Sequence, residues 1–474
     1  MLSTSGLHAL ARLLPVSAGL AVLIAAGCAT YQPRPLAPVA LAEHFEQRRL
    51  DDPGLQRYIA RHLGPASSAA GAWNLSTLTL AAFYFNPELD VARARWGSTK
   101  ATVVTAGQRP NPVLQLPFGL TTNPAAGASP YLYGLALDLP VETAGKRGYR
   151  VAQAEQLSDA AQAQIGEAAW QVRARLRSAL LDLYAAEREA AILVREEALQ
   201  QHILALMEGR LAQGAASGPE VALVRAEWAR TRIGTAQARS RAEAARAAIA
   251  SAVGVPVAAV QGLAIDVGAF DRAAPDDLGA QARREALLNR ADLRAALARY
   301  EASQSALQLE VARQYPDIHL GPGYTFDAGQ NKFALTLSGI ELPVFHRNEG
   351  PIEQAQARRK EAAAQFTALQ AQAIVATDQA VQAYRSAQAL LALNDGLQAD
   401  AERALQRAAQ AFDAGQTDRL ALLSAQGSAL ASQLTRAQAW VAVQRAIGQS
   451  EDALQRPLAA ADAQALRPLM ETEQ

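Results

Sequence analysis

The sequence is poor in cysteine, in aromatic residues and in net charge, and each shortage excludes a class of protein. With one cysteine among 474 residues, internal disulfides and thiolate metal sites are excluded. Lysine plus arginine equal aspartate plus glutamate at 45 each, so there is no basic excess to attract nucleic acid. Aromatic residues make up only 5% of the chain, and its abundant alanine suits closely packed helices.

Signatures of enzymes are missing as well. The six histidines, at positions 8, 44, 62, 202, 319 and 346, form no closely spaced pair of metal ligands. The sequence contains no phosphate-binding loop, no nucleophile elbow and no zinc-protease helix. We therefore predict a protein that is not an enzyme, with no catalytic residue, no metal site and no cofactor.

The N-terminal segment predicts export from the cytoplasm. An apolar run at residues 13–27 follows Arg12, and its length of about fifteen residues is too short for a membrane span of roughly 20. The small residues Ala25-Ala26-Gly27 before Cys28 resemble the lipobox of bacterial lipoproteins, in which the signal is cut before a cysteine that is then acylated. The alternative is a cysteine that merely ends an apolar signal.

This resemblance implies a signal peptide at residues 1–27 and a lipidation site, carrying palmitate, at Cys28. Ala29 stands where an aspartate would argue for retention at the inner membrane, so the implied location is the outer membrane, with the body in the periplasm. The proline-rich stretch 31–38 cannot be helical, and we expect residues 28–72 to form a tether.

The remainder of the chain repeats itself. Pro112-Val113-Leu114 aligns with Pro316-Asp317-Ile318 at an offset of about 204 positions. Leu139-Pro140-Val141 aligns with Leu342-Pro343-Val344 at an offset of about 203. Because further matches follow in the same order, we interpret the chain as a duplication.

Each copy contains two segments in which large apolar residues alternate with small or polar ones. They are residues 113–121 and 131–139 in the first copy, and 317–326 and 333–338 in the second. This period predicts two β-hairpins with one apolar face. Alternation also fits a half-buried soluble sheet, but the length of about ten residues, the tyrosines near the ends and the small opposite face favour membrane-spanning barrel strands.

Four strands are too few to close a barrel. An open sheet in lipid would leave the backbone N–H and C=O groups of its edges unpaired, so the strands predict an oligomer. Pro117 and Pro322 each remove a hydrogen-bond donor, and we expect a bulge or a kink at both. His319 falls on the small face, where it is expected to line the lumen, most simply as an incidental residue.

Long helical runs follow the strands. Residues 145–213 and 348–414 have apolar residues at helical spacing and almost no helix breakers, and each would form a helix of roughly 100 Å. Gly214 and Gly415 interrupt the two runs at matching places, and helical pattern resumes after each. Each copy is thus expected to contain a helical hairpin opposite its strand hairpin.

Two copies of helix, strand, strand, long helix, turn and helix resemble the TolC-type outer-membrane efflux family, in its lipoprotein branch. The likeness covers a first repeat at residues 73–265 and a second at 278–458, followed by a C-terminal tail at 459–474. It implies an α+β membrane protein in which three protomers contribute four transmembrane strands each to one barrel, continued by a periplasmic α-helical barrel.

The resemblance also implies function and partners. Such a protein is a passive conduit for drugs or heavy-metal ions, and works as a homotrimer with a periplasmic adaptor protein and an inner-membrane pump. Contact with outer-membrane lipid is implied, and contact with nucleic acid is not. The alternatives are an outer-membrane component of protein secretion and a non-conducting coiled-coil lipoprotein scaffold.

The residues of the periplasmic tip are implied in the same way. The positions at which family members meet the adaptor correspond to Arg210, Leu211, Gly214, Phe412 and Gly415.

Two carboxylates flank the second turn. Under threefold symmetry, Asp413 and Asp418 are candidates for a gate that favours cations. The alternative for both is a solvated turn or cap residue, and Asp418 is well placed as the N-cap of the next helix.

Overall fold

The computed structural model describes residues 29–64, 73–272 and 282–459, and divides the chain into two compact units, 1–48 and 49–474. In the described part of the first unit, residues 29–37 form no helix or strand, and helix α2 (Pro38–Glu46) begins at a proline, which is tolerated in a first turn. The predicted signal peptide and Cys28 lie outside the described residues.

The second unit is mainly helical, and its long helices confirm the predicted runs. Helices α7 (Lys146–Ala212) and α11 (Glu349–Asp413) have 67 and 65 residues, and each is followed by a helix of 36 residues, α8 (Gly218–Val253) and α12 (Arg419–Leu454). No helix in the described ranges is both long and apolar enough to cross a membrane.

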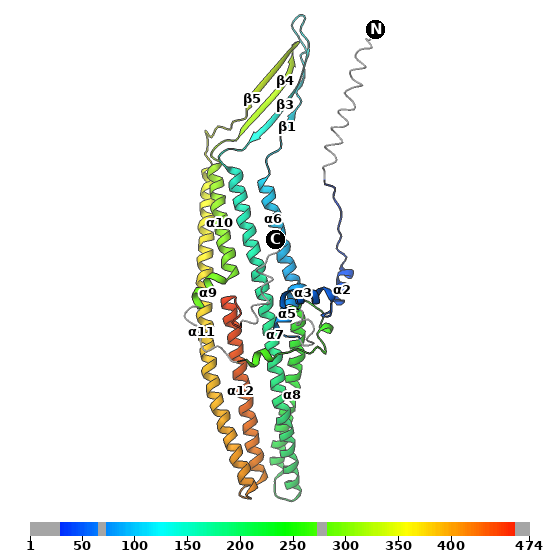
Figure 1. Ribbon diagram of the computed structural model, residues 1–474, viewed down its shortest axis with the longest axis vertical. Helices are drawn as coiled ribbons and strands as arrows, with labels where there is room; N and C mark the ends of the chain where they lie inside the picture. The colour runs from blue at the N-terminus through cyan, green and yellow to red at the C-terminus, as the bar shows by residue number, and fades with distance from the viewer. Residues whose placement is uncertain (1–28, 65–72, 273–281, 460–474) are drawn as a thin grey trace. The chain divides into compact units, whose positions relative to one another are not determined.

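Helix α7 is the spine of this unit. It contacts α8, α12, α6 (Pro87–Gly107) and α10 (Ala291–Ala312), and α11 contacts α10 and α12 in the same manner (Figure 1). Shorter elements complete the unit, namely α3 (Pro53–Leu63), α5 (Leu75–Phe85), α9 (Ala282–Asn289) and the 3-10 helices η1 (Val257–Ala259) and η2 (Gly268–Asp271).

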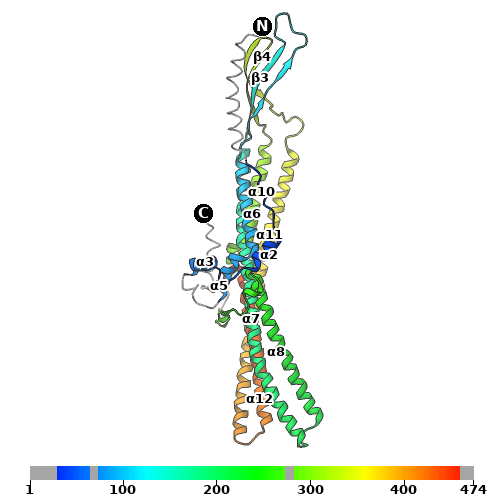
Figure 2. The same ribbon diagram turned by 90° about the vertical axis from the view of Figure 1, so that its right-hand side faces the viewer.

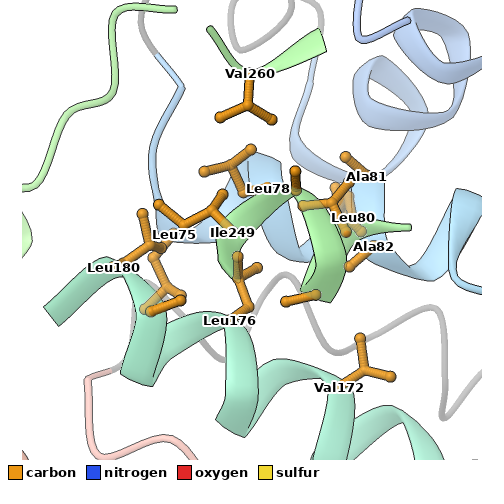
Figure 3. Close-up of a cluster of buried hydrophobic side chains, with 14 of the residues drawn as sticks. Leu75, Leu78, Leu80, Ala81, Ala82, Val172, Leu176, Leu180, Ile249 and Val260 are labelled. Atoms are coloured by element: carbon orange, nitrogen blue, oxygen red, sulfur yellow. The ribbon is translucent and has the colours of Figure 1, made fainter. Parts of the chain in front are cut away.

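The largest hydrophobic core lies where α5 packs on α7 and α8. Helix α5 is apolar around most of its circumference, which is typical of a helix enclosed on all sides. Figure 3 shows Leu75 and Ile249 close to Leu176 and Leu180 of α7, and all four side chains are buried. Burying a leucine in such a core contributes about 1.5–3 kcal/mol.

The strands form one antiparallel sheet. Its order is β1 (Val113–Gln115), β3 (Tyr131–Val141), β4 (Ile318–Asp327) and β5 (Gln330–Ser338), with β2 (Phe118–Leu120) also paired to β3. Both predicted hairpins are present, and the β3–β4 pairing joins the two copies. Figures 1 and 2 place the sheet at the opposite end of this unit from the α7–α8 and α11–α12 turns.

The predicted alternation holds across the whole sheet. Large apolar residues pair with one another from strand to strand, as do Leu114 with Leu137 and Tyr324 with Phe333. Their face is exposed, with Phe333 83% accessible. A contiguous exposed apolar face marks contact with lipid or with another protein.

Of the bulge or kink expected at Pro117 and Pro322, the bulge is wrong. Pro117 separates β1 from β2, yet both strands pair with β3 in one continuous register. Pairing of β4 with β3 likewise stops beside Pro322 and resumes in the same register, while β4–β5 pairing runs through it. Each proline thus removes one ladder hydrogen bond, because it has no N–H, without inserting the extra residue that defines a bulge.

Candidate functional site

The α7–α8 and α11–α12 turns, which we call the tip, are built alike. Gly214 and Gly415 have φ of 72° and 67°, the left-handed conformation that glycine adopts most readily. The N–H of Ala215 donates to the carbonyl of Arg210 at 2.8 Å, and the N–H of Gln416 donates to that of Ala411 at 2.8 Å. These bonds satisfy carbonyl groups that a helix end leaves open, so the two glycines end the long helices.

Both returning helices are capped by side chains. Asp418 accepts the backbone N–H of Ala421 at 2.9 Å, so its expected role as an N-cap is confirmed. Ser217 and Glu220 form a capping box at the start of α8. The backbone N–H and the hydroxyl of Ser217 donate to Glu220 and lower the pKa of that carboxyl.

Asp418 also joins the two helical hairpins. Nη2 of Arg210, in the last turn of α7, lies 2.8 Å from Oδ2 of Asp418 at the start of α12. Donation by Arg210, followed by that of the Ala421 N–H, lowers the pKa of Asp418. The pair is open to solvent, with the side chains 35% and 53% exposed. Solvent screens such an ion pair strongly.

The other tip residues differ in exposure and in whether they have a partner. Leu211 is exposed, and Phe412 is half-buried at the end of α11. Asp413 is exposed, and no hydrogen bond or ion pair joins it to another residue in the part of the chain that the structure describes. Of the two gate candidates, therefore, Asp418 is paired with a described residue of its own chain, and Asp413 has no such partner among the described residues.

A buried ionic cluster lies between α7 and α12, and sequence reasoning missed it. Glu451 accepts from Arg173 at 3.0 Å and lies 3.2 Å from Nε of Arg177. Arg177 also donates two hydrogen bonds of 3.1 Å to the carbonyl of Gln444. Arg173 and Glu451 are only 1% and 3% exposed. The signal available in the sequence was the pair of arginines one turn apart beside the apolar stripe of α7.

Asp452 lies beside this cluster. Burial, with a contribution from the neighbouring Glu451 charge, raises the pKa of Asp452, although Trp170 donates to it at 3.0 Å. Gly448 faces Arg177 so closely that a Cβ at this position would overlap the guanidinium. The cluster therefore depends on a glycine for space.

A second set of polar contacts joins the two copies where the sheet meets the helices. Lys146, in the first turn of α7, donates to Asp317 at 2.7 Å, and the backbone N–H of Thr143 donates to the same oxygen at 2.9 Å. Burial opposes ionisation of Asp317, but donation by Lys146 and Thr143 outweighs it and lowers the pKa of Asp317. This junction was not found from the sequence, since its partners come from different copies.

Within the described ranges, no three histidine, cysteine, aspartate or glutamate side chains come together as metal ligands. The arrangement is therefore one of helix ends, packed helices and an exposed sheet. It brings Arg210 and Asp418 together and sets Gly214 and Gly415 at the same end of the unit.

Comparison with known proteins gives the family. The family model described as "Outer membrane efflux protein" matches residues 82–255 and 282–459. The cobalt-zinc-cadmium resistance protein CzcC of Cupriavidus metallidurans is 26% identical over 363 residues, covering 76% of this chain and 84% of that protein.

Solved structures share the fold. The outer membrane protein VceC of Vibrio cholerae superposes with a TM-score of 0.66 at 22% identity, covering 81% of this chain and 97% of that one. The channel protein CusC gives a TM-score of 0.63 at 17% identity, covering 80% and 91%. Members of this family are outer-membrane channels that work with adaptor proteins and inner-membrane pumps. Because the family model matches most of both copies, the chain belongs to the outer membrane efflux protein family, as a channel and not as an enzyme.

Proposed function

We propose that this chain is the outer-membrane channel subunit of a tripartite metal-ion efflux system, in which three copies close one barrel. The observation that carries the proposal is the exposed apolar face of the sheet, which adjoins two helices of 67 and 65 residues. A lipid-facing wall at one end and long helical hairpins at the other suit a conduit across the outer membrane and periplasm.

The trimer is supported by the edges of the sheet. Within one chain, β1 with β2 forms one edge and β5 forms the other. A barrel needs about eight strands before it closes around side chains, and an unpaired edge in lipid costs several kcal/mol for each open group. Pairing β5 of one copy with β1 and β2 of the next removes every edge.

The tip is the proposed contact with the adaptor. Arg210, Leu211, Gly214, Phe412 and Gly415 lie on or beside the two turns, where a partner can reach the exposed Leu211.

The Arg210–Asp418 pair is proposed to hold this end closed within each subunit. Asp413, which has no partner among the described residues, is proposed to supply the carboxylate ring that favours cations. The pair joins the end of α7 to the start of α12, so breaking it frees one hairpin from the other at the tip.

Cargo and anchoring are further parts of the proposal. The relative CzcC is named for cobalt, zinc and cadmium resistance, which favours divalent metal ions over drugs as cargo.

Cys28 is proposed to carry the lipid, after removal of residues 1–27, with residues 28–72 as the tether. The repeats are proposed at 73–265 and 278–458, with 459–474 as a tail.

The first test is single-channel conductance of the purified full chain in a planar lipid bilayer. We expect discrete, long-lived steps, cross-linking to a trimer, and loss of cation preference in Asp413→Asn. A protein that never conducts and stays monomeric would contradict the proposal and favour the coiled-coil scaffold. Conductance with passage of folded polypeptide would favour protein secretion instead.

The trimer is tested by proline substitution on β5. Asp327 and Gln330 flank a two-residue hairpin loop and form a hydrogen-bonded pair. Hydrogen-bonded and non-hydrogen-bonded pairs alternate along an antiparallel ladder, which makes Pro322–Leu335 a non-hydrogen-bonded pair. The N–H of Leu335 therefore points away from β4, to the free edge. Leu335→Pro is expected to reduce the trimer on cross-linking and leave the β4–β5 hairpin paired. The matched control, Ala334→Pro, removes an inward N–H and is expected to disrupt the hairpin itself. A full yield of trimer from Leu335→Pro would contradict pairing through this edge.

A further inference from the structure

His319 is held in a side-chain pair that the tip and the helices do not explain. Its Nδ1 lies 3.0 Å and 3.2 Å from the two carboxylate oxygens of Asp138. The residues come from different copies, His319 from β4 and Asp138 from β3. Both belong to the small, polar set of their strands, on the face opposite the exposed apolar one.

The register explains how the two side chains meet. The direct partner of His319 is Pro140, and the same register continued across the interruption beside Pro322 puts Asp138 level with Gly321. Diagonal neighbours in an antiparallel pair are within reach of long side chains, and Gly321 has no side chain to stand between them. The other charged residues of the described strands, Asp327 and Lys332, pair with each other at 2.9 Å beside the β4–β5 turn. Asp138 therefore has the histidine as its partner.

The contact with Asp138 determines which nitrogen of the His319 ring is free to bind a ligand. A carboxylate that accepts from Nδ1–H leaves the lone pair of Nε2 pointing away, which is the arrangement found in histidines that bind metals. No described residue hydrogen-bonds to Nε2, and the His319 and Asp138 side chains are 35% and 25% exposed. The nitrogen can thus be reached from water.

We propose that His319, positioned by Asp138, is a contact point in the channel wall for divalent cations of intermediate softness, such as Zn²⁺ and Co²⁺. Imidazole nitrogen is a preferred ligand of these ions. One nitrogen per subunit binds weakly, which suits a conduit, since an ion must leave the site as readily as it enters. This inference rests on the proposed channel, because the small face lines the lumen only in a closed barrel.

The first experiment measures the Zn²⁺ concentration that halves the single-channel current of the full chain. His319→Ala is expected to raise this concentration at least tenfold. Asp138→Asn is expected to raise it about tenfold, as loss of a carboxylate behind a ligating histidine does elsewhere. The control, His346→Ala, changes an exposed histidine outside the strands and is expected to leave the block unchanged. Equal block of His319→Ala and the unsubstituted protein would overturn the inference while leaving the channel intact.

A second experiment does not depend on conductance. Diethyl pyrocarbonate modifies free imidazole nitrogens, and peptide mass spectrometry reports the extent at each histidine. Millimolar Zn²⁺ is expected to protect His319 severalfold more than His346, and the difference is expected to disappear in Asp138→Asn. Equal modification of His319 with and without Zn²⁺ would contradict the inference, whether or not the protein conducts. Failure to conduct would contradict the proposed function and not this inference.

Discussion

Several arginine–carboxylate pairs join α7 to α12 or to its N-cap, and two of them, Arg173–Glu451 and Arg210–Asp418, differ most clearly in burial. Arg173 and Glu451 are 1% and 3% exposed, whereas Arg210 and Asp418 at the tip are 35% and 53% exposed. The chemistry is the same, but breaking a buried pair strands a charge in a medium that cannot solvate it. The comparison indicates that the two helices are fixed near the ionic cluster and separable at the tip.

The largest effect is expected from Glu451→Ala. Removal of this carboxylate leaves two arginines buried without their counter-charge, which costs about 3–5 kcal/mol. We expect a strongly lowered melting temperature, measured by circular dichroism in detergent. Asp395→Ala is the control, because it breaks a solvent-exposed pair with Arg436 and is expected to change the melting temperature little. Equal effects of the two substitutions would remove the distinction between buried and exposed pairs.

The second largest loss of stability is expected from Gly448→Ala. The added Cβ overlaps the Arg177 guanidinium, and overpacking of this kind costs about 1–3 kcal/mol. The matched control is Gly396→Ala, in the interior of α11, where a Cβ meets no atom within 4 Å. That change is expected to stabilise the protein slightly, since alanine favours helix more than glycine does. Thermal unfolding of the two variants side by side decides the point, and destabilisation by Gly396→Ala would refute it.

At the tip, Asp418→Asn is expected to change function more than stability. Asparagine caps a helix as well as aspartate does, so the melting temperature should stay unchanged, while the charge that holds Arg210 is lost. Recordings in a bilayer are expected to show a higher open probability. Asp418→Ala, which also removes the cap, is the control for helix fraying. An unchanged open probability would mean that this pair does not keep the tip closed.

Protonation of Asp418 at low pH is expected to have the same effect as Asp418→Asn, because both remove the negative charge that pairs with Arg210. The pKa of Asp418 is lowered in the folded protein, so the pair contributes above the ordinary value of 3.8 and is lost as pH falls through the lowered one. Open probability should therefore be constant from pH 5 to pH 8. If open probability changed between pH 5 and pH 8, and Asp418→Asn abolished that change, the pKa of Asp418 would not be lowered as described.

The smallest effect is expected from Asp452→Asn. The pKa of Asp452 is raised by burial, so its ionisation opposes folding increasingly as pH rises above the unfolded value of 3.8. The amide keeps an oxygen to accept from Trp170 and carries no charge. We expect a slightly higher melting temperature at pH 7 and no difference at pH 3. A lower melting temperature at pH 7 would show that the carboxylate charge is needed by Arg173 and Arg177.

Features that depend on neighbouring residues could be predicted from the sequence. The strands follow from period-two alternation, the long helices from the scarcity of breakers, and the tip turns from Gly214 and Gly415. Contacts between distant residues could not. Arg173 and Glu451 are 278 positions apart, and Thr143 and Asp317 are 174 apart. No local pattern reports such pairs. Of the bulge or kink predicted at Pro117 and Pro322, the bulge is wrong because a missing N–H does not require an inserted residue.

The way the two copies interlock bears on how the chain is made. Strand β3 pairs with β4, Thr143 and Lys146 hold Asp317, and α7 packs along α12, so each copy contributes half of each contact. During synthesis the first copy emerges from the ribosome with these surfaces still uncovered. The first copy supplies most of the largest hydrophobic core, but these contact surfaces stay exposed to aggregation until the second copy has been translated.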